Sequence, residues 1–101
     1  MSKWADFAIH AVRFNSAHTH IDRVRAFPDN GDKLGISEEH LRQDIVAAIK
    51  RGVTYVTTFK DDQGNWSKGQ PVFIVSINGN DYIKTVENRK EVDNLDNLPE
   101  F

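Results

Sequence analysis

The sequence predicts an α+β fold in which one helix covers one face of an antiparallel sheet of about five strands. Two observations predict it. Residues 37–52 carry apolar side chains at helical spacing, whereas the other apolar segments are rich in β-branched and aromatic residues. A helix of this length is only marginally stable alone in water, so its apolar stripe has to pack on the sheet. The expected order is strand, strand, helix, strand, strand, strand.

Length and composition indicate one small domain. The 101 residues fit a single unit, within which residues 86–101 form a C-terminal strap or tail. Cysteine is absent, so disulfides and thiolate metal sites are excluded. The net charge of −2 gives no strong nucleic-acid signal. The opening residues are not a signal peptide and no apolar run is long enough to span a bilayer, so we expect a cytoplasmic protein without a membrane segment.

The first two strands are predicted over residues 4–14 and 21–27. Phe7 and Ile9 alternate with residues of the other face, as in a strand. The polar link between the two segments is short, which favours an antiparallel pair. A Pro-Asp-Asn-Gly-Asp cluster then predicts a turn over residues 28–32.

The helix has signals at both ends. Ser37 is a suitable N-cap, because its hydroxyl can accept from backbone N–H groups of the first turn. Gly52 suits the position after the last turn. Ile36 could pack on Leu41 across the start of the helix. The stripe expected to face the sheet consists of Leu41, Ile45, Ala48 and Ile49.

Three further strands follow the helix. They are predicted over residues 53–60, 66–77 and 81–85, the second interrupted at Gly69-Gln70-Pro71. Asn78-Gly79 is a strong hairpin signal.

The acidic tail contains spaced apolar residues, Leu95, Leu98 and Phe101. These residues either dock on the sheet as an irregular strap or belong to a disordered tail.

Basic residues on neighbouring strands suggest an anion-binding surface. Arg13, Arg23 and Arg25 lie on the first two strands, and with His20 they could form a cationic strip on the sheet face away from the helix. Guanidinium groups bind phosphate or carboxylate in a bidentate manner. The aromatic residues that could add a stacking surface are Tyr55, Phe59 and Trp66. The alternative is a solvated face whose arginines pair with nearby acidic residues.

A metal site is the second candidate. His18, His20 and Asp22 have the spacing at which side chains of an extended strand point the same way, so they could share a zinc ion. The alternative is that two histidines fall in a polar turn without a ligand. No nucleophile elbow, EF-hand loop or glycine-rich phosphate loop is present in the sequence.

These features favour a non-enzymatic binding module that engages a protein or an anionic small ligand through the sheet face. The alternative is a small metal-dependent hydrolase built on the His-x-His-x-Asp segment. An uncovered edge strand would also allow two copies to pair as a homodimer.

Four segments together resemble a family of short bacterial and phage proteins known only as a domain of unknown function. They are Lys3-Trp4-Ala5-Asp6, His18-Thr19-His20-Ile21-Asp22 within residues 15–22, Arg42-Gln43-Asp44, and the closing stretch from Asp93 to Phe101. The resemblance covers nearly the whole chain and implies that the tail belongs to the folded unit, in a cytoplasmic setting. It implies no activity, ligand or catalytic residue.

Overall fold

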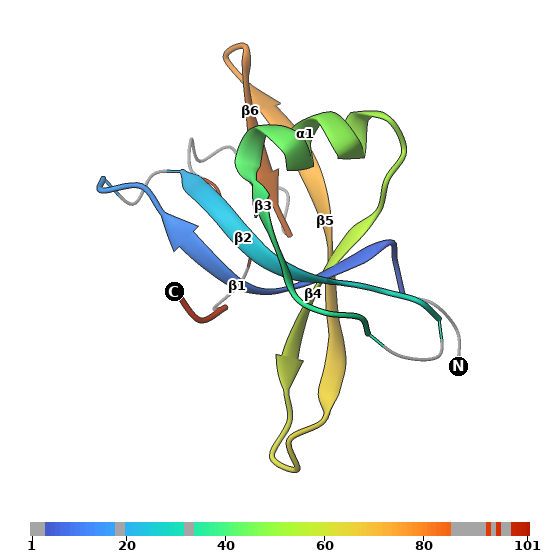
Figure 1. Ribbon diagram of the computed structural model, residues 1–101. Coiled ribbons are helices and arrows are strands. Elements are labelled where there is room, and N and C mark those ends of the chain that lie inside the picture. Colours follow the sequence, from blue (N-terminus) through green and yellow to red (C-terminus); the bar gives the residue numbers. More distant parts are fainter. Residues whose placement is uncertain (1–3, 18–19, 32–33, 86–92, 94, 96–97) are drawn as a thin grey trace.

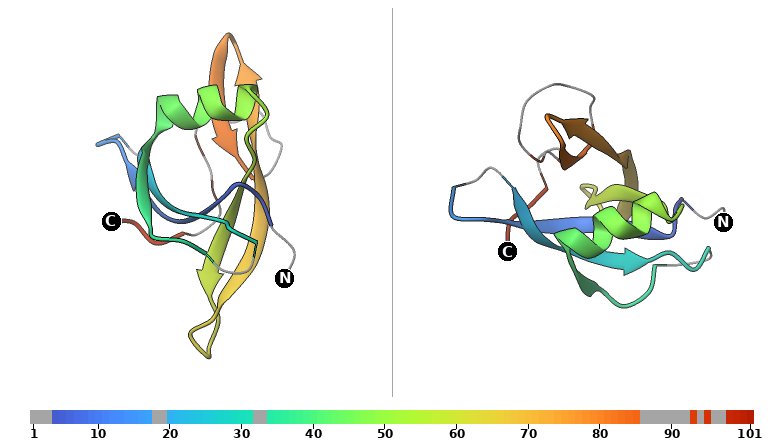
Figure 2. Two further views of the ribbon diagram at one scale, coloured as in Figure 1. Left: turned by 45° about the vertical axis from the view of Figure 1, so that its right-hand side comes forward. Right: turned by 90° about the horizontal axis from the view of Figure 1, so that it is seen from above.

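The computed structural model of the protein describes residues 4–17, 20–31, 34–85, 93, 95 and 98–101. The strands are β1 (Phe7–Phe14), β2 (Ile21–Pro28), β3 (Glu38–Leu41), β4 (Tyr55–Lys60), β5 (Trp66–Ile77) and β6 (Asn80–Lys84), and the helix is α1 (Arg42–Lys50). These strands form one sheet in the order β3-β2-β1-β4-β5-β6, with α1 lying across its upper part (Figures 1 and 2). No helix in the described part of the chain is both long and apolar enough to cross a membrane.

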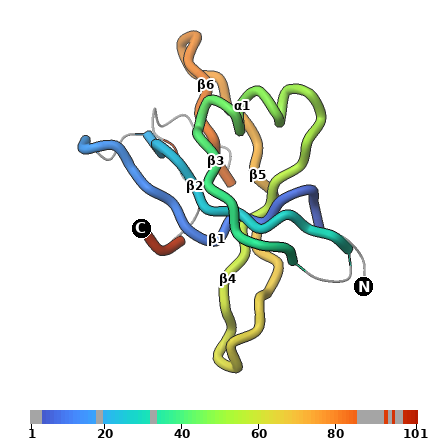
Figure 3. Tube along the Cα trace, in the orientation of Figure 1, coloured from blue at the N-terminus to red at the C-terminus, as the bar shows by residue number. Residues whose placement is uncertain are grey.

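The expected sheet-plus-helix fold is confirmed, but the sheet is mixed and six-stranded, not antiparallel with about five strands. β1 lies between β2 and β4, as the trace in Figure 3 shows. It pairs with β4 in parallel, from Phe7 opposite Tyr55 to Ile9 opposite Thr57, while the other neighbouring strands are antiparallel. The parallel pair arises because β2, β3 and α1 together make the crossover that brings the chain back in the direction of β1.

The extra strand lies where the sequence predicts the first turn of the helix. Ser37 is not the N-cap, because residues Glu38–Leu41 form β3, which pairs with β2. Leu41 precedes the helix and makes no side-chain cap. Ile36 and Leu41 are 87% and 41% exposed, so they form no buried staple. The physical reason is that several backbone hydrogen bonds to β2 outweigh a single side-chain cap, which contributes about 1 kcal/mol.

The end of the helix is as predicted, and so is its buried face apart from Leu41, which lies outside the helix and is exposed. Gly52 follows the last turn with φ +98°, in the left-handed region that glycine tolerates. Ile45 is fully buried and Ala48 nearly so, and both pack on the sheet. Their neighbours in this main core are Ile9, Val12, Ile21, Val24, Ala26, Tyr55, Val72 and Ile83, together with Leu95 and Leu98 of the tail.

The interruption predicted at Gly69-Gln70-Pro71 is a β-bulge inside the continuous strand β5. The pairing of β4 with β5 shifts register between Val56 and Thr58. Gly69 lies so close to β4 that a Cβ there would stand 2.2 Å from Thr57 Oγ1. The Gln70 N–H donates to the same hydroxyl at 2.9 Å. The glycine is needed here because the two backbones approach closely.

A smaller apolar cluster is separate from the main core. It consists of Ala5, Ala8 and Val56, with Trp4 and Leu34 packed against it. Ala8 and Val56 alternate along their strands with Ile9 and Tyr55 of the main core, so this cluster lies on the face of the sheet away from α1.

Candidate functional site

Two of the predicted arginines lie together on the face of the sheet away from α1. Arg13 of β1 stands directly opposite Arg23 of β2, and Arg25 stands opposite Ala11. Val12 and Val24, which alternate with them, belong to the helix-side core. Arg13 and Arg25 are exposed.

The other two residues of the predicted strip have different surroundings. Arg23 Nη1 lies 3.3 Å from Glu39 Oε2, an ion pair that joins β2 to the edge strand β3. The His20 ring stacks on Tyr82 with ring centroids 5.4 Å apart and is not beside Arg25. The structure therefore brings all three arginines to one face, with Arg23 paired to Glu39, and places His20 at another site.

The tail brings an aromatic ring to the two exposed arginines. Its segment 99–101 runs along β1: the Val12 N–H donates to the Pro99 carbonyl at 2.9 Å, and the Phe101 N–H donates to the Val12 carbonyl at 3.0 Å. Arg25 Cζ lies 4.3 Å from the centroid of the Phe101 ring, and Arg13 Cζ lies 5.6 Å from it. Both distances fall within the range of cation–π attraction, so one ring holds two guanidinium groups on this face.

A second group of rings and a cation lies beside the first. The His10 ring stacks on Phe27 at 4.3 Å, and Trp66 approaches Phe27 edge-on at 4.9 Å. Lys60 Nζ stands 5.3 Å from the Trp66 ring. His10 Nε2 and Ser37 Oγ are 2.7 Å apart, which fixes the imidazole between β1 and the start of β3.

His10 connects the two groups electrostatically. Burial lowers the pKa of the His10 imidazole, and the positive charges of Arg25 and Lys60 lower it further. Phe27 of the second group is two residues after Arg25 of the first group on β2 and shares its face, so the two groups are neighbours on the sheet. We call the surface that they form together the cation–ring strip: Arg13, Arg25, Lys60, His10, Phe27, Trp66 and Phe101.

Sequence reasoning named part of this strip and missed the rest. Of the aromatic residues that it proposed for stacking, Trp66 is in the strip, but Tyr55 is 3% exposed and belongs to the core. Phe27 could have been found, because it is two residues after Arg25 on the same strand and so shares its face. Lys60 and Phe101 could not be found from the spacing of residues along one strand. Lys60 reaches this face through the β4–β5 hairpin, and Phe101 reaches it through the returning tail.

A hydrogen-bonded chain of titratable groups lies at the edge strand. His40 Nδ1 is 2.9 Å from the Tyr55 hydroxyl, and His40 Nε2 is 3.0 Å from Glu38 Oε1. Burial raises the pKa of Tyr55 to about 12, so this phenol keeps its proton at neutral pH. The Glu38 carboxylate can only accept, so His40 Nε2 carries the hydrogen of that bond. Both imidazole nitrogens are then occupied, and the chain fastens β3 to β4 without leaving a nitrogen free to act as a general base.

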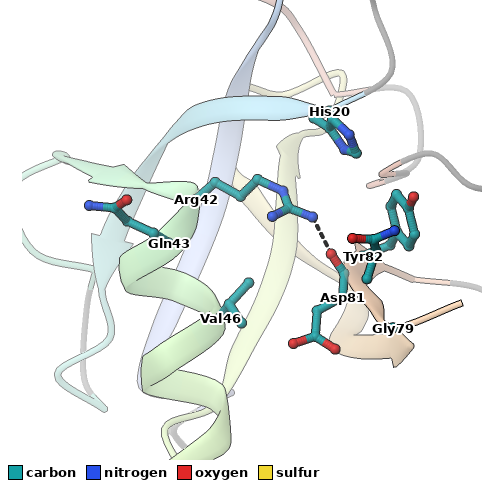
Figure 4. A pocket seen from close by; sticks show the side chains of 8 residues that line it. His20, Arg42, Gln43, Val46, Gly79, Asp81 and Tyr82 are labelled. Carbon is teal, nitrogen blue, oxygen red and sulfur yellow. Dashed lines mark hydrogen bonds between the residues drawn. The ribbon is translucent and has the colours of Figure 1, made fainter. Parts of the chain in front are cut away.

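A polar hollow of about 440 Å³ lies between the start of α1 and the tip of the β5–β6 hairpin (Figure 4). Arg42 reaches into it between His20 and Asp81. Its guanidinium is fixed by Asp93: Nε lies 2.7 Å from Oδ2 and Nη2 lies 3.1 Å from Oδ1, and Nη2 also donates to the Asp81 carbonyl. The hydrogen bond to Asp93 raises the pKa of Arg42.

Asp93 links this hollow to the rest of the fold. Its fully buried carboxylate also accepts the Ile21 N–H at 2.7 Å and the Ile83 N–H at 2.9 Å. One side chain of the tail thus joins β2, β6 and α1. We call Arg42 and Asp93 with these two N–H groups the Asp93 clasp, and its geometry is that of a structural tie.

The predicted metal ligands are only partly described. His20 and Asp22 both line a second hollow, of about 400 Å³, on the other side of Arg42. His18 lies outside the described residues. Among the residues that are described, no three His, Asp or Glu side chains gather in a way that could hold a metal ion.

The comparison with protein families gives one match. A family model described as a protein of unknown function (DUF3892) matches residues 8–99, which is most of the chain. Neither the curated proteins nor the solved structures gave a match.

Proposed function

Since the chain belongs to the DUF3892 family of proteins of unknown function, whose membership assigns no activity, we propose from the geometry that it is a non-enzymatic binding module. The module takes an anionic partner on the cation–ring strip. The observation that carries the proposal is the convergence of Arg13 and Arg25 on the ring of Phe101. In the described part of the chain, neither guanidinium forms an ion pair with a carboxylate.

The contrast with the other arginines supports this choice. Arg23 pairs with Glu39 through Nη1 and Arg42 is held by Asp93, so each already has a carboxylate partner within the fold. Arg13 and Arg25 keep their donors available while the ring restrains their orientation. A restrained guanidinium loses less side-chain entropy on binding, and its planar fork matches a phosphate or a carboxylate.

The test is binding of inorganic polyphosphate at low salt, measured by isothermal titration calorimetry. Polyglutamate serves as a second, carboxylate probe. We expect Arg13→Ala and Arg25→Ala each to weaken binding by about 10- to 150-fold, since hydrogen bonds to charged groups contribute about 1.5–3 kcal/mol. Arg51→Ala is the matched control, because it removes the same charge from an exposed position just after α1.

Two results would contradict the proposal. One is the absence of binding of either probe at low salt. The other is an equal loss of affinity in the Arg51 control and in the strip variants, which would mean that only net charge matters.

A metal-dependent hydrolase is the second candidate, because His20 and Asp22 line the same hollow. Elemental analysis of the purified protein tests it, with His20→Ala as the comparison. Stoichiometric zinc that is lost in this variant supports the candidate. Metal below about a tenth of stoichiometry after zinc has been added removes it, because a site with the affinity of structural or catalytic zinc retains its ion through purification.

A further inference from the structure

Cations and rings alternate along the cation–ring strip. Arg13 and Arg25 both lie over the ring of Phe101, and Lys60 lies over the ring of Trp66. The strip thus holds two adjacent units, each of which combines positive charge with an aromatic side chain. Arg13, Arg25 and Lys60 are exposed, and the rings are partly exposed.

The two units follow each other along β2. Arg25 contacts the first unit through Phe101, and Phe27 contacts the second through Trp66. Arg25 and Phe27 are alternate residues of one strand, about 6.7 Å apart, so the two contacts start from neighbouring positions on the same face. A ligand that engages both units therefore has to repeat its own charge and its own ring at a similar interval.

This requirement distinguishes between anionic ligands. A single phosphate or a mononucleotide could engage only one unit. An acidic peptide repeats negative charge without a ring at each repeat. A duplex keeps its bases stacked inside, where the rings of the protein cannot reach their faces. A single strand of nucleic acid has one phosphate and one stackable base in every repeat, which is the pattern that aromatic and basic grooves bind.

We propose that the anionic partner of the cation–ring strip is single-stranded nucleic acid, an inference that rests on the proposed function. Its phosphates contact Arg13, Arg25 and Lys60, and a base stacks at Trp66, whose ring is partly exposed. The ring of Phe101 is already covered by the two guanidinium groups, which it holds in place for the phosphates.

The net charge of −2 does not oppose binding of a nucleic acid, because binding depends on the local cations. Two acidic residues adjoin the strip in sequence. Asp61 accepts the N–H groups of residues 63 and 65 in its own turn, and Glu100 precedes Phe101 in the segment that bridges to Val12.

The experiment measures fluorescence anisotropy of a labelled oligothymidylate of about 12 nucleotides as a function of salt. With three phosphates neutralised, the plot of log K against log[salt] has an expected slope of about −2, since each phosphate on a single strand contributes about −0.7. Arg25→Ala should make the slope shallower by about 0.7. Affinity should also rise from the mononucleotide to the oligonucleotide.

The aromatic contribution is tested separately with Trp66→Leu. Loss of one stacking platform should weaken oligothymidylate binding by about 5- to 150-fold. Polyphosphate has no base to stack, so its binding should weaken by much less. Trp4→Leu is the matched control, because Trp4 packs on the Ala5, Ala8 and Val56 cluster. Thermal unfolding of both variants, followed by circular dichroism, confirms that each is folded at the temperature of the titration. Lys60→Ala, a change at an exposed side chain, provides a second variant of the same unit.

The outcomes separate this inference from the proposed function. If polyphosphate or polyglutamate binds as tightly as oligothymidylate and Trp66→Leu changes nothing, the nucleic-acid inference is wrong while the anion-binding function stands. Tighter binding of a duplex than of the single strand would also overturn the inference. If no anionic probe binds, both proposals fail together.

Discussion

Replacing Asp93 with alanine tests the Asp93 clasp most directly. The change removes the acceptor for the N–H groups of Ile21 and Ile83 and for two donors of Arg42. Each buried donor left without an acceptor costs about 1–3 kcal/mol, and removing one partner of a buried ion pair costs about 3–5 kcal/mol. Because these terms overlap, we expect a total loss of about 3–5 kcal/mol, a large share of the roughly 5–15 kcal/mol that stabilises a domain.

Urea unfolding followed by circular dichroism measures this loss. With an m-value of about 1–1.5 kcal/mol per molar urea, the midpoint should fall by about 2–5 M. Arg42→Ala should cost less, because Asp93 would still accept both backbone N–H groups. Asp22→Ala, at an exposed carboxylate, is the control and should stay within about 0.5 kcal/mol of the parent. A loss of less than about 1 kcal/mol for Asp93→Ala would refute the reasoning, because a buried acceptor of several donors cannot be removed so cheaply.

Three further predictions concern the core, the bulge and pH. Ile45→Asp should lower the free energy of unfolding by more than about 4 kcal/mol, because it buries an unpaired charge. Ala47→Asp, on the exposed side of α1, should leave a folded protein, and similar melting temperatures of the two variants would mean that the helix faces another way. Gly69→Ala should cost about 1–3 kcal/mol because the new methyl group meets Thr57, and an unchanged urea midpoint would contradict the close approach of β4 and β5. Because the pKa of His10 is lowered in the folded state, the unfolded chain binds this proton more readily, and stability should fall as the pH drops below about 6.5. His10→Gln should weaken that fall, as measured by melting temperatures at about pH 7.5 and about pH 5.5, and an identical pH profile would be evidence against the burial of the imidazole.

Local patterns in the sequence predicted the parts of the fold that depend on near neighbours. The burial of Ile45 and Ala48, the glycine at the end of the helix and the Asn78-Gly79 hairpin all follow from spacing and turn chemistry within a few residues. The first antiparallel pair also followed, because its connecting segment is short. The prediction of Ser37 as the N-cap was wrong, because a residue suited to an N-cap is equally suited to the polar segment before an edge strand.

The features that could not be predicted depend on residues far apart in the chain. The parallel pairing of β1 with β4 and the pairing of β3 with β2 are decided by which strand edges meet, not by local propensity. The candidate site shows the same division. The proximity of Arg13 and Arg25 follows from the first hairpin, whereas the contacts of Phe101 and of Lys60 depend on the tail and on a second hairpin.

The parallel junction of β1 with β4 has a consequence for how the chain reaches its native state. Asp6 and Thr54, which bond at the start of this junction, are 48 positions apart. Closing so long a loop is entropically costly, which slows folding relative to a helical protein of the same size. During synthesis, the edge of β1 that pairs with β4 therefore stays unpaired until the ribosome has added the whole intervening segment. In that interval the unpaired border of β1 is open to other nascent chains, so aggregation competes most strongly before β4 emerges.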